Sequence, residues 1–181
     1  DGRARNLRQG GTTTGAIGFI LVDVANPFFS SILRGIEDVA RDRDYLVLAG
    51  SSDGAIAREE QLVEDFIARR VDGLIVVPSG PGVGSLATEL ERGTPVVFLD
   101  LEPDDVEVDL VRSDHVGGAR LDTEHLIERG HRDIAFIGDD PTIFSAGARL
   151  DGFRAAIDAA GLQVPNHRVI TGRHSPDTWR T

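Results

Sequence analysis

The chain has 181 residues, of which 40% are hydrophobic, so it can build a real core, and its net charge of −11 disfavours nucleic-acid binding by its bulk. It contains no cysteine, which excludes disulfides, thiolate catalysis and zinc–thiolate sites, and no lysine, which excludes P-loop and Schiff-base lysines. No apolar run reaches the ~20 residues of a membrane span and no secretory signal is evident, so we expect a cytoplasmic protein.

Residues 1–15 differ from the rest of the chain in charge and composition. Three arginines against one aspartate give this segment a net charge of +2, so the remaining residues carry −13. A Gly-Gly pair and a run of three threonines precede the first apolar segment. We interpret residues 1–15 as a linker, with a disordered terminus as the alternative, and expect residues 1 to about 14 to be weakly ordered.

The next segment combines a buried strand with an amphipathic helix, and the chain then repeats this plan. Ala16–Val22 is an apolar run of strand length, typical of a strand that is covered on both faces. Asn26 is a good N-cap and Pro27 suits the first helical position, so a helix is predicted to begin at Pro27. Its apolar residues recur at three- and four-residue spacing, which provides one face for the sheet.

The repeats form a first series and a second series that begins near Ser113. In the first series, strands are predicted at 45–49, 73–78, 96–99 and 108–111, with helices at 59–70 and around 86–90. In the second series, helices at 116–129 and 146–160 alternate with strands at 134–137 and 168–171, and a last helix begins at 175–177. Strands and helices that alternate in this way predict a parallel α/β sheet.

Polar residues follow the ends of the predicted strands, at Asp23, Asp53, Ser79, Asp100 and Asp114. In a parallel sheet such positions gather along one edge, where carboxylates can accept hydrogen bonds from a sugar- or nucleoside-like ligand. Two alternatives stay open: the aspartates are ordinary cap and turn residues, or they serve a magnesium-dependent enzyme. The enzyme is the weaker alternative, because no general acid–base pair stands out.

Two further features argue against a nucleotide or metal site. The glycine-rich loop at 80–84 lacks the lysine of a P-loop and the glycine spacing of a dinucleotide fold, so we interpret it as an ordinary βα loop. The five histidines are scattered, without the spacing that places two metal ligands on one helix face. We therefore predict no cofactor, no metal and no catalytic residue.

Five segments of the chain carry a recognisable pattern in combination: Ala16-Ile-Gly-Phe-Ile, Asn26-Pro-Phe-Phe, Arg70-Val-Asp-Gly-Leu-Ile, His125-Leu-Ile-Glu-Arg-Gly-His and Arg149-Leu-Asp-Gly-Phe. Together they resemble the effector-binding domain of lactose-repressor (LacI) family transcription regulators. The Asn-Pro-Phe-Phe and His-Leu-Ile-x-x-Gly-His segments are specific in combination. The resemblance covers nearly the whole chain.

The resemblance implies a periplasmic-binding-protein-like fold of type I, with flavodoxin-like parallel sheets in two lobes. Residues 1–15 would be the hinge after a missing helix-turn-helix head, residues 16–112 the N-terminal lobe and residues 113–181 an incomplete C-terminal lobe. A small sugar- or nucleoside-like effector would bind between the lobes and control operator DNA binding by the head, in a protein that forms homodimers. The alternative is a periplasmic sugar-binding protein of an ABC transporter, whose ligand site would look alike.

The resemblance also implies which residues contact the effector. It matches first-lobe positions to Phe28, Phe29 and Asp100, and second-lobe positions to Ser145, Arg149 and His174. Together with Asp53 and Ser79 from the strand ends, these residues form the predicted ligand site. The guanidinium of Arg149 would donate to hydroxyls or to a carboxylate of the effector.

The sequence departs from the family pattern at two positions that bear on these expectations. His115 stands where many members have Asn, which leaves the class of effector open. Asp44 stands where a helix-ending Gly is usual, so Asp44 must adopt a positive φ, which Asp tolerates better than most residues.

Overall fold

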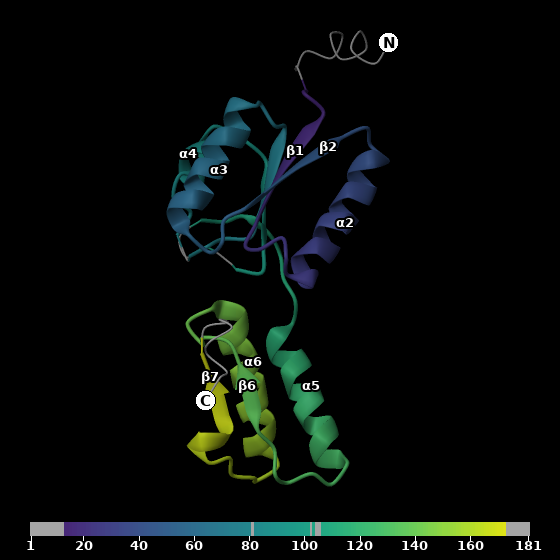
Figure 1. Cartoon of the computed structure of the whole chain (residues 1–181), viewed down its shortest axis with the longest axis vertical. Helices are drawn as coiled ribbons and strands as arrows, with labels where there is room; N and C mark the ends of the chain where they lie inside the picture. Colours follow the sequence, from purple (N-terminus) through teal and green to yellow (C-terminus); the bar gives the residue numbers. More distant parts are fainter. Residues whose placement is uncertain (1–12, 81, 102, 104–105, 173–181) are drawn as a thin grey trace. The chain divides into compact units, whose positions relative to one another are not determined.

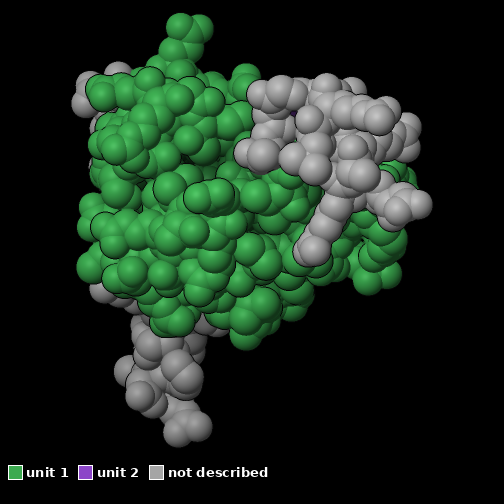
Figure 2. All heavy atoms as spheres, turned by 90° about the horizontal axis from the view of Figure 1, so that it is seen from above, with its two compact units in different colours: residues 1–112 green, residues 113–181 purple. Residues whose placement is uncertain are grey.

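The computed structural model describes residues 13–80, 82–101, 103 and 106–172. The chain divides into two compact units, Asp1–Arg112 and Ser113–Thr181, each with its own parallel sheet. Figure 1 shows the elements of both units, and Figure 2 colours their atoms by unit. Most of the predicted linker, the site residue His174 and the helix predicted from 175–177 lie outside the described residues.

Unit 1 contains a five-stranded sheet in the order β2-β1-β3-β4-β5, and every neighbouring pair of strands is parallel. The strands are β1 (Ala16–Leu21), β2 (Leu46–Ser51), β3 (Gly73–Val76), β4 (Val96–Leu99) and β5 (Asp109–Val111), and the helices are α2 (Pro27–Arg41), α3 (Ile56–Ala68) and α4 (Leu86–Glu91). This is the flavodoxin-like order, in which the direction of strand addition reverses between β1 and β3. The predicted parallel α/β sheet is confirmed.

Helices cover both faces of this sheet. Successive side chains of β1 point to opposite faces, and each set is buried against helices. Ile20 is fully buried in one core cluster with Phe66 of α3 and Leu86 of α4. Phe19 and Leu21 belong to a second cluster, which includes the inner side chains of α2. Figure 1 accordingly shows α3 and α4 on one side of the sheet and α2 on the other. A strand buried on both faces requires a continuous apolar run, as the sequence predicted.

The first helix begins where the Asn-Pro pair predicts. The side-chain oxygen of Asn26 accepts a hydrogen bond from the N–H of Phe28 at 3.0 Å, and Pro27 is the first helical residue. Beyond the helix, Asp44 adopts a φ of 60°, so the positive φ predicted there is confirmed. This turn leads directly into β2.

The described part of unit 2, residues 113–172, contains two α-helices and two short strands. They are α5 (His115–Glu128), β6 (Phe136–Gly138), α6 (Phe144–Ala159) and β7 (Val169–Thr171), with a 3-10 helix η1 (Asn166–Arg168) before β7. The two helices pack closely at Gly152 of α6. A Cβ added there would lie only 2.2 Å from the carbonyl oxygen of Val116 in α5, so the contact requires a glycine. A core cluster of Ile134, Leu150, Phe153 and Ile157 fills the unit.

The strand predicted at 134–137 begins later in the structure, at Phe136. Its parallel partner β7 starts at Val169, directly opposite Phe136, and η1 occupies the preceding residues. Ile134 has no strand partner there and packs into the core, with 7% of its surface exposed. The apolar run therefore reflects burial at Ile134 and strand pairing only from Phe136 onward.

Candidate functional site

The strand ends of unit 1 are joined by backbone hydrogen bonds along the carboxyl edge of the sheet. Beyond β1 and β2, the N–H of Asp53 donates to the carbonyl oxygen of Val22 at 2.8 Å. Beyond β3, the N–H of Val77 donates to the carbonyl oxygen of Ile20 at 2.8 Å. In an open parallel sheet, ligands bind at this edge, at the point where the strand order reverses.

A buried polar network lies at this reversal point, and it includes the predicted site residue Ser79. The hydroxyl oxygens of Ser79 and Ser52 are hydrogen-bonded at 3.0 Å, and the Ser52 hydroxyl donates to the carbonyl oxygen of Leu21 at 3.3 Å. The backbone N–H of Ser79 donates to Oε2 of Glu59 at 2.5 Å. Ser52 is fully buried and Glu59 is only 7% exposed, so the network joins the ends of β1, β2 and β3 to α3 away from bulk water.

Glu59 was not predicted as a site residue, although its position in α3 carried a signal. Val63 and Phe66, four and seven residues later, are both buried, so Glu59 lies on the apolar face of the helix. Burial raises the pKa of Glu59 above its ordinary value, while the hydroxyl and the backbone N–H of Ser79 act in the opposite direction and Glu60 raises it further. A carboxyl group on the apolar face of a helix is thus a detectable anomaly in the sequence.

The two predicted site aspartates of unit 1 share a left-handed backbone. Asp53 has a φ of 53° and Asp100 a φ of 69°, values that Asp adopts more readily than most residues. The exposed Asp53 carboxylate forms an ion pair with Arg58 near the start of α3. An effector that binds the Asp53 carboxylate must therefore displace Arg58 from it or share it with Arg58.

The two predicted site phenylalanines differ in their environment. Their rings lie edge to face, with centroids 5.2 Å apart and planes inclined by 71°. Phe28 is 47% exposed, whereas Phe29 packs against the core that contains Phe19 and Leu21. Phe28 therefore presents an aromatic surface at the outside of unit 1, and Phe29 packs beneath it.

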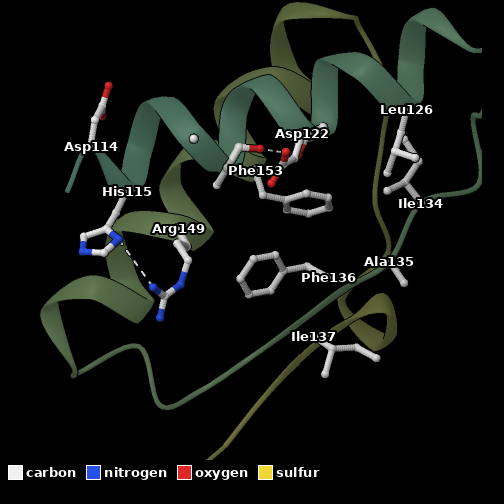
Figure 3. A pocket seen from close by; sticks show the side chains of 13 residues that line it. Asp114, His115, Asp122, Leu126, Ile134, Ala135, Phe136, Ile137, Arg149 and Phe153 are labelled. Atoms are coloured by element: carbon white, nitrogen blue, oxygen red, sulfur yellow. Dashed lines mark hydrogen bonds between the residues drawn. The ribbon is translucent and has the colours of Figure 1, made fainter. Parts of the chain in front are cut away.

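In unit 2, the predicted site residues Ser145 and Arg149 lie one turn apart on α6 and so share a face of that helix. Ser145 is half-buried and Arg149 is exposed. A guanidinium nitrogen of Arg149 lies 3.4 Å from Nδ1 of His115, the first residue of α5. Figure 3 shows the Arg149 side chain turned toward His115. The residue that departs from the family pattern thus contacts the predicted effector arginine.

A cavity of about 410 Å³ lies within unit 2, between α5, β6 and α6. His115 and Arg149 line its polar part, while Leu126, Phe136 and Phe153 line an apolar part (Figure 3). The rings of Phe136 and Phe153 have centroids 5.2 Å apart. A small hydroxylated ligand needs convergent polar groups, so only the polar part suits such an effector.

The remaining aspartates at the predicted strand ends have local structural partners. Oδ1 of Asp23 accepts from the N–H of Ala25 at 2.8 Å, and Oδ1 of Asp114 accepts from the N–H of Gly117 at 2.8 Å as the N-cap of α5. For these two residues, the cap-and-turn alternative describes the observed contacts. Within the described ranges, no group of three or more His, Cys, Asp or Glu side chains could hold a metal ion. Over the same residues, no helix combines the length and apolar character needed to cross a membrane.

The structure thus places the predicted residues of unit 1 at one sheet edge and Arg149 of unit 2 beside His115. The carboxylates, hydroxyl and aromatic ring at the first place, and the guanidinium at the second, suit contacts with a polar ligand.

Comparisons with known proteins agree with this chemistry. A family described as periplasmic binding proteins and sugar binding domain of LacI family matches residues 14–178. The ribose operon repressor of Escherichia coli strain K12 is 33% identical over 170 residues, which are 93% of this chain and 51% of that protein. The chain therefore spans about half the length of the curated relatives it matches.

Solved structures show the same relationship. The Cra transcriptional dual regulator from Pseudomonas putida, in complex with fructose 1-phosphate, is similar with a TM-score of 0.78 and 34% identity, covering 88% of this chain and 58% of that one. A LacI family transcriptional regulator from Enterococcus faecium with bound ribose gives a TM-score of 0.70 and 29% identity, covering 86% of this chain and 56% of that one.

Proposed function

Because the chain belongs to the family that unites periplasmic binding proteins with the sugar-binding domain of LacI-type regulators, we propose that it is the effector-sensing domain of a bacterial transcription regulator. The named relatives are repressors and regulators, which favours this function over sugar delivery to an ABC transporter. In this proposal residues 1–15 are the hinge, residues 16–112 the N-terminal lobe and residues 113–181 part of the C-terminal lobe. The longer protein would read operator DNA through a head that precedes this chain.

The proposed effector is a small sugar or a related molecule, and both units contribute to its binding. From unit 1, Asp100, Asp53 and Ser79 supply hydrogen-bonding groups and Phe28 supplies an apolar surface for a sugar ring. From unit 2, Arg149 and Ser145 supply donors on one helix face. His174 completes the predicted set. The observation that carries this proposal is the carboxyl edge of unit 1, where Asp53, Ser79 and Asp100 follow the ends of β2, β3 and β4 in a sheet whose strand order reverses between β1 and β3.

Calorimetric titration of this chain with D-ribose and with fructose 1-phosphate tests the proposal. We expect saturable binding of at least one of them, and NMR of the recovered sugar should show it chemically unchanged, since the proposed function is binding rather than catalysis. The absence of binding to any pentose, hexose or sugar phosphate in a broad panel would contradict a sugar effector. Conversion of the sugar would contradict a pure sensor.

We further propose that the intact regulator is a cytoplasmic homodimer that responds to its effector by a change in operator affinity. Two-fold symmetric dimers are the common form in which such heads read two half-sites of an operator. Fluorescence anisotropy of operator DNA with the longer protein, with and without effector, would measure this response. Equal operator affinity with and without a bound effector would contradict regulation.

A further inference from the structure

The buried hydrogen-bond network around Glu59 connects α3 to residues that follow two strands of the sheet. Its carboxylate is 7% exposed, and it accepts the backbone N–H of Ser79 rather than a group on its own helix. Ser79 follows β3, and Ser52 follows β2, so a single carboxyl group connects two ligand-edge loops to α3. Burying a carboxylate is costly, and a helix face that needed only packing would carry an apolar residue there.

We propose that Glu59 is a positioning residue of the candidate site, because its carboxylate holds Ser79, just after β3, in place for the effector. The proposal rests on the proposed function in assigning Ser79 to the effector site. Glu59 itself is only 7% exposed, and its carboxylate contacts the candidate site through the backbone N–H of Ser79. Its influence on binding is therefore exerted through Ser79.

The geometry explains why position 59 must supply an acceptor. The Ser79 N–H is the donor, and a carboxylate oxygen of Glu59 is the acceptor at 2.5 Å, so the contact is a hydrogen bond to a group that can carry a charge. Glutamine keeps a side-chain oxygen at the same reach, while leucine fills a similar volume without an acceptor. Glu59→Gln should therefore retain the position of Ser79, and Glu59→Leu should release it.

The carboxyl group also makes this positioning sensitive to pH. The charged group that acts on Glu59 is Glu60, its neighbour on α3, whereas Ser79 and Ser52, on the adjoining loops, are uncharged. Burial raises the pKa of Glu59, so its protonation takes place above the pH at which an ordinary glutamate titrates. A protonated carboxyl accepts the Ser79 N–H less strongly, so effector affinity should fall as the pH falls through this range.

Unit 1 offers a matched control in Glu89, which is 8% exposed and also bridges a helix to a loop. Its carboxylate accepts from Arg92 at 2.7 Å and from the hydroxyl of Thr94 at 3.1 Å. Thr94 precedes β4, so this network lies at the amino edge of the sheet, opposite the proposed ligand edge. Glu89→Leu disturbs a buried carboxylate without touching the effector site.

The experiment combines D-ribose titration with NMR of the Ser79 amide in the whole chain. In wild type, the Ser79 amide proton should resonate downfield and shift with the titration of Glu59. Glu59→Leu should move it upfield, abolish its pH dependence and weaken D-ribose binding at least tenfold. Glu59→Gln should retain affinity within about threefold but lose the pH dependence of binding, and Glu89→Leu should leave both affinity and its pH profile unchanged.

The outcomes separate this inference from the proposed function. If wild type binds no D-ribose, the sugar function fails for this probe, and the amide measurements in the four proteins alone decide the inference. An unshifted Ser79 amide in Glu59→Leu, or wild-type D-ribose affinity in a folded Glu59→Leu chain, would overturn it. A loss of affinity as large in Glu89→Leu would also overturn it, because the effect would then be one of general stability.

Discussion

Arg149 is the side chain through which unit 2 would reach an effector, and it is exposed at the end of a helix face that also carries Ser145. Its hydrogen-bonding neighbour is His115, at 3.4 Å, which carries an imidazole rather than a carboxylate. Within the described residues no carboxylate forms an ion pair with Arg149, so donors of its guanidinium are available for a ligand. The pair therefore combines the positively charged guanidinium of Arg149 with the imidazole of His115, which orients it.

Replacement of Arg149 by alanine should weaken D-ribose binding at least tenfold. A lost hydrogen bond to a charged group costs ~1.5–3 kcal/mol, which corresponds to about 10- to 150-fold in affinity. Because Arg149 is exposed, the free energy of unfolding should change by less than about 0.5 kcal/mol. Arg154→Ala, an exposed arginine on the same helix, is the matched control and should bind as wild type. Affinity within twofold of wild type for Arg149→Ala would refute the assignment.

The packing of α5 on α6 depends on Gly152, whereas Gly35 of α2 has open space around it. A Cβ at Gly152 would lie 2.2 Å from the carbonyl oxygen of Val116, a contact that only movement of the helices relieves. A Cβ at Gly35, in α2, would meet nothing within 4 Å. The same substitution thus acts on two different physical terms, close packing in one helix and backbone entropy in the other.

Gly152→Ala should destabilise the chain by ~1–3 kcal/mol, the usual cost of overpacking, although alanine is the better helix former. Gly35→Ala should stabilise it by ~0.5–1 kcal/mol, because the unfolded chain loses entropy and no contact is strained. Urea unfolding of both variants measures the two signs. Equal changes in the two variants would show that helix propensity rather than packing determines the outcome.

The pH dependence of stability provides a separate test of α3 through Glu59. Its pKa is raised in the folded state, mainly by burial, so between the unfolded value of 4.5 and the folded value the folded state binds more protons. The contribution of Glu59 to stability is therefore largest below pH 4.5 and is lost as the pH rises through that window. Glu59→Gln has no such loss, so its stability relative to wild type should increase with pH there and then level off. A difference in unfolding free energy that stays constant across this window would contradict the buried titration.

The sequence was most informative where one physical requirement determines a residue pattern. The apolar run at β1 and the Asn26-Pro27 pair predicted a covered strand and a helix start, because burial on both faces and capping leave few alternatives. The apolar run was less informative at β6, where Ile134 is buried outside the strand and pairing begins only at Phe136. Pairing depends on β7, 33 residues later, and on η1 before it, and local sequence does not encode that register.

The candidate site was predictable in outline but not in its supporting contacts. Strand ends of a parallel sheet must share an edge, so Asp53, Ser79 and Asp100 could be placed there from sequence order alone. The ion pair of Asp53 with Arg58 and the hydrogen bond from Ser79 to Glu59 depend on how the loops turn. Glu59 lies near the start of α3, where an acid is also explained by a favourable interaction with the helix dipole. Its place on the apolar face and its burial in the structure favour the supporting role.

At the scale of the whole molecule, the two compact units have separate cores. The clusters around Ile20 and around Phe19 consist of residues of unit 1, and the cluster around Ile157 consists of residues of unit 2. Each core cluster of the described part therefore lies within one unit. Units that share no core need not unfold together. A ligand that contacts both units should therefore raise the unfolding free energy of both, and a ligand that contacts one unit should raise that of one.

We predict that conservative core substitutions destabilise the units separately, whereas D-ribose stabilises both. Ile20→Val and Ile157→Val remove one buried methyl group each, at residues 0% and 4% exposed, and should cost ~0.5–1.5 kcal/mol in their own unit alone. D-ribose at 100 times its dissociation constant adds ~2.7 kcal/mol to any unit whose unfolding releases it. Hydrogen exchange followed by mass spectrometry in increasing urea resolves peptides of the two units. Protection gained by unit 1 peptides alone would mean that unit 2 takes no part in binding, which would remove Arg149 and Ser145 from the site.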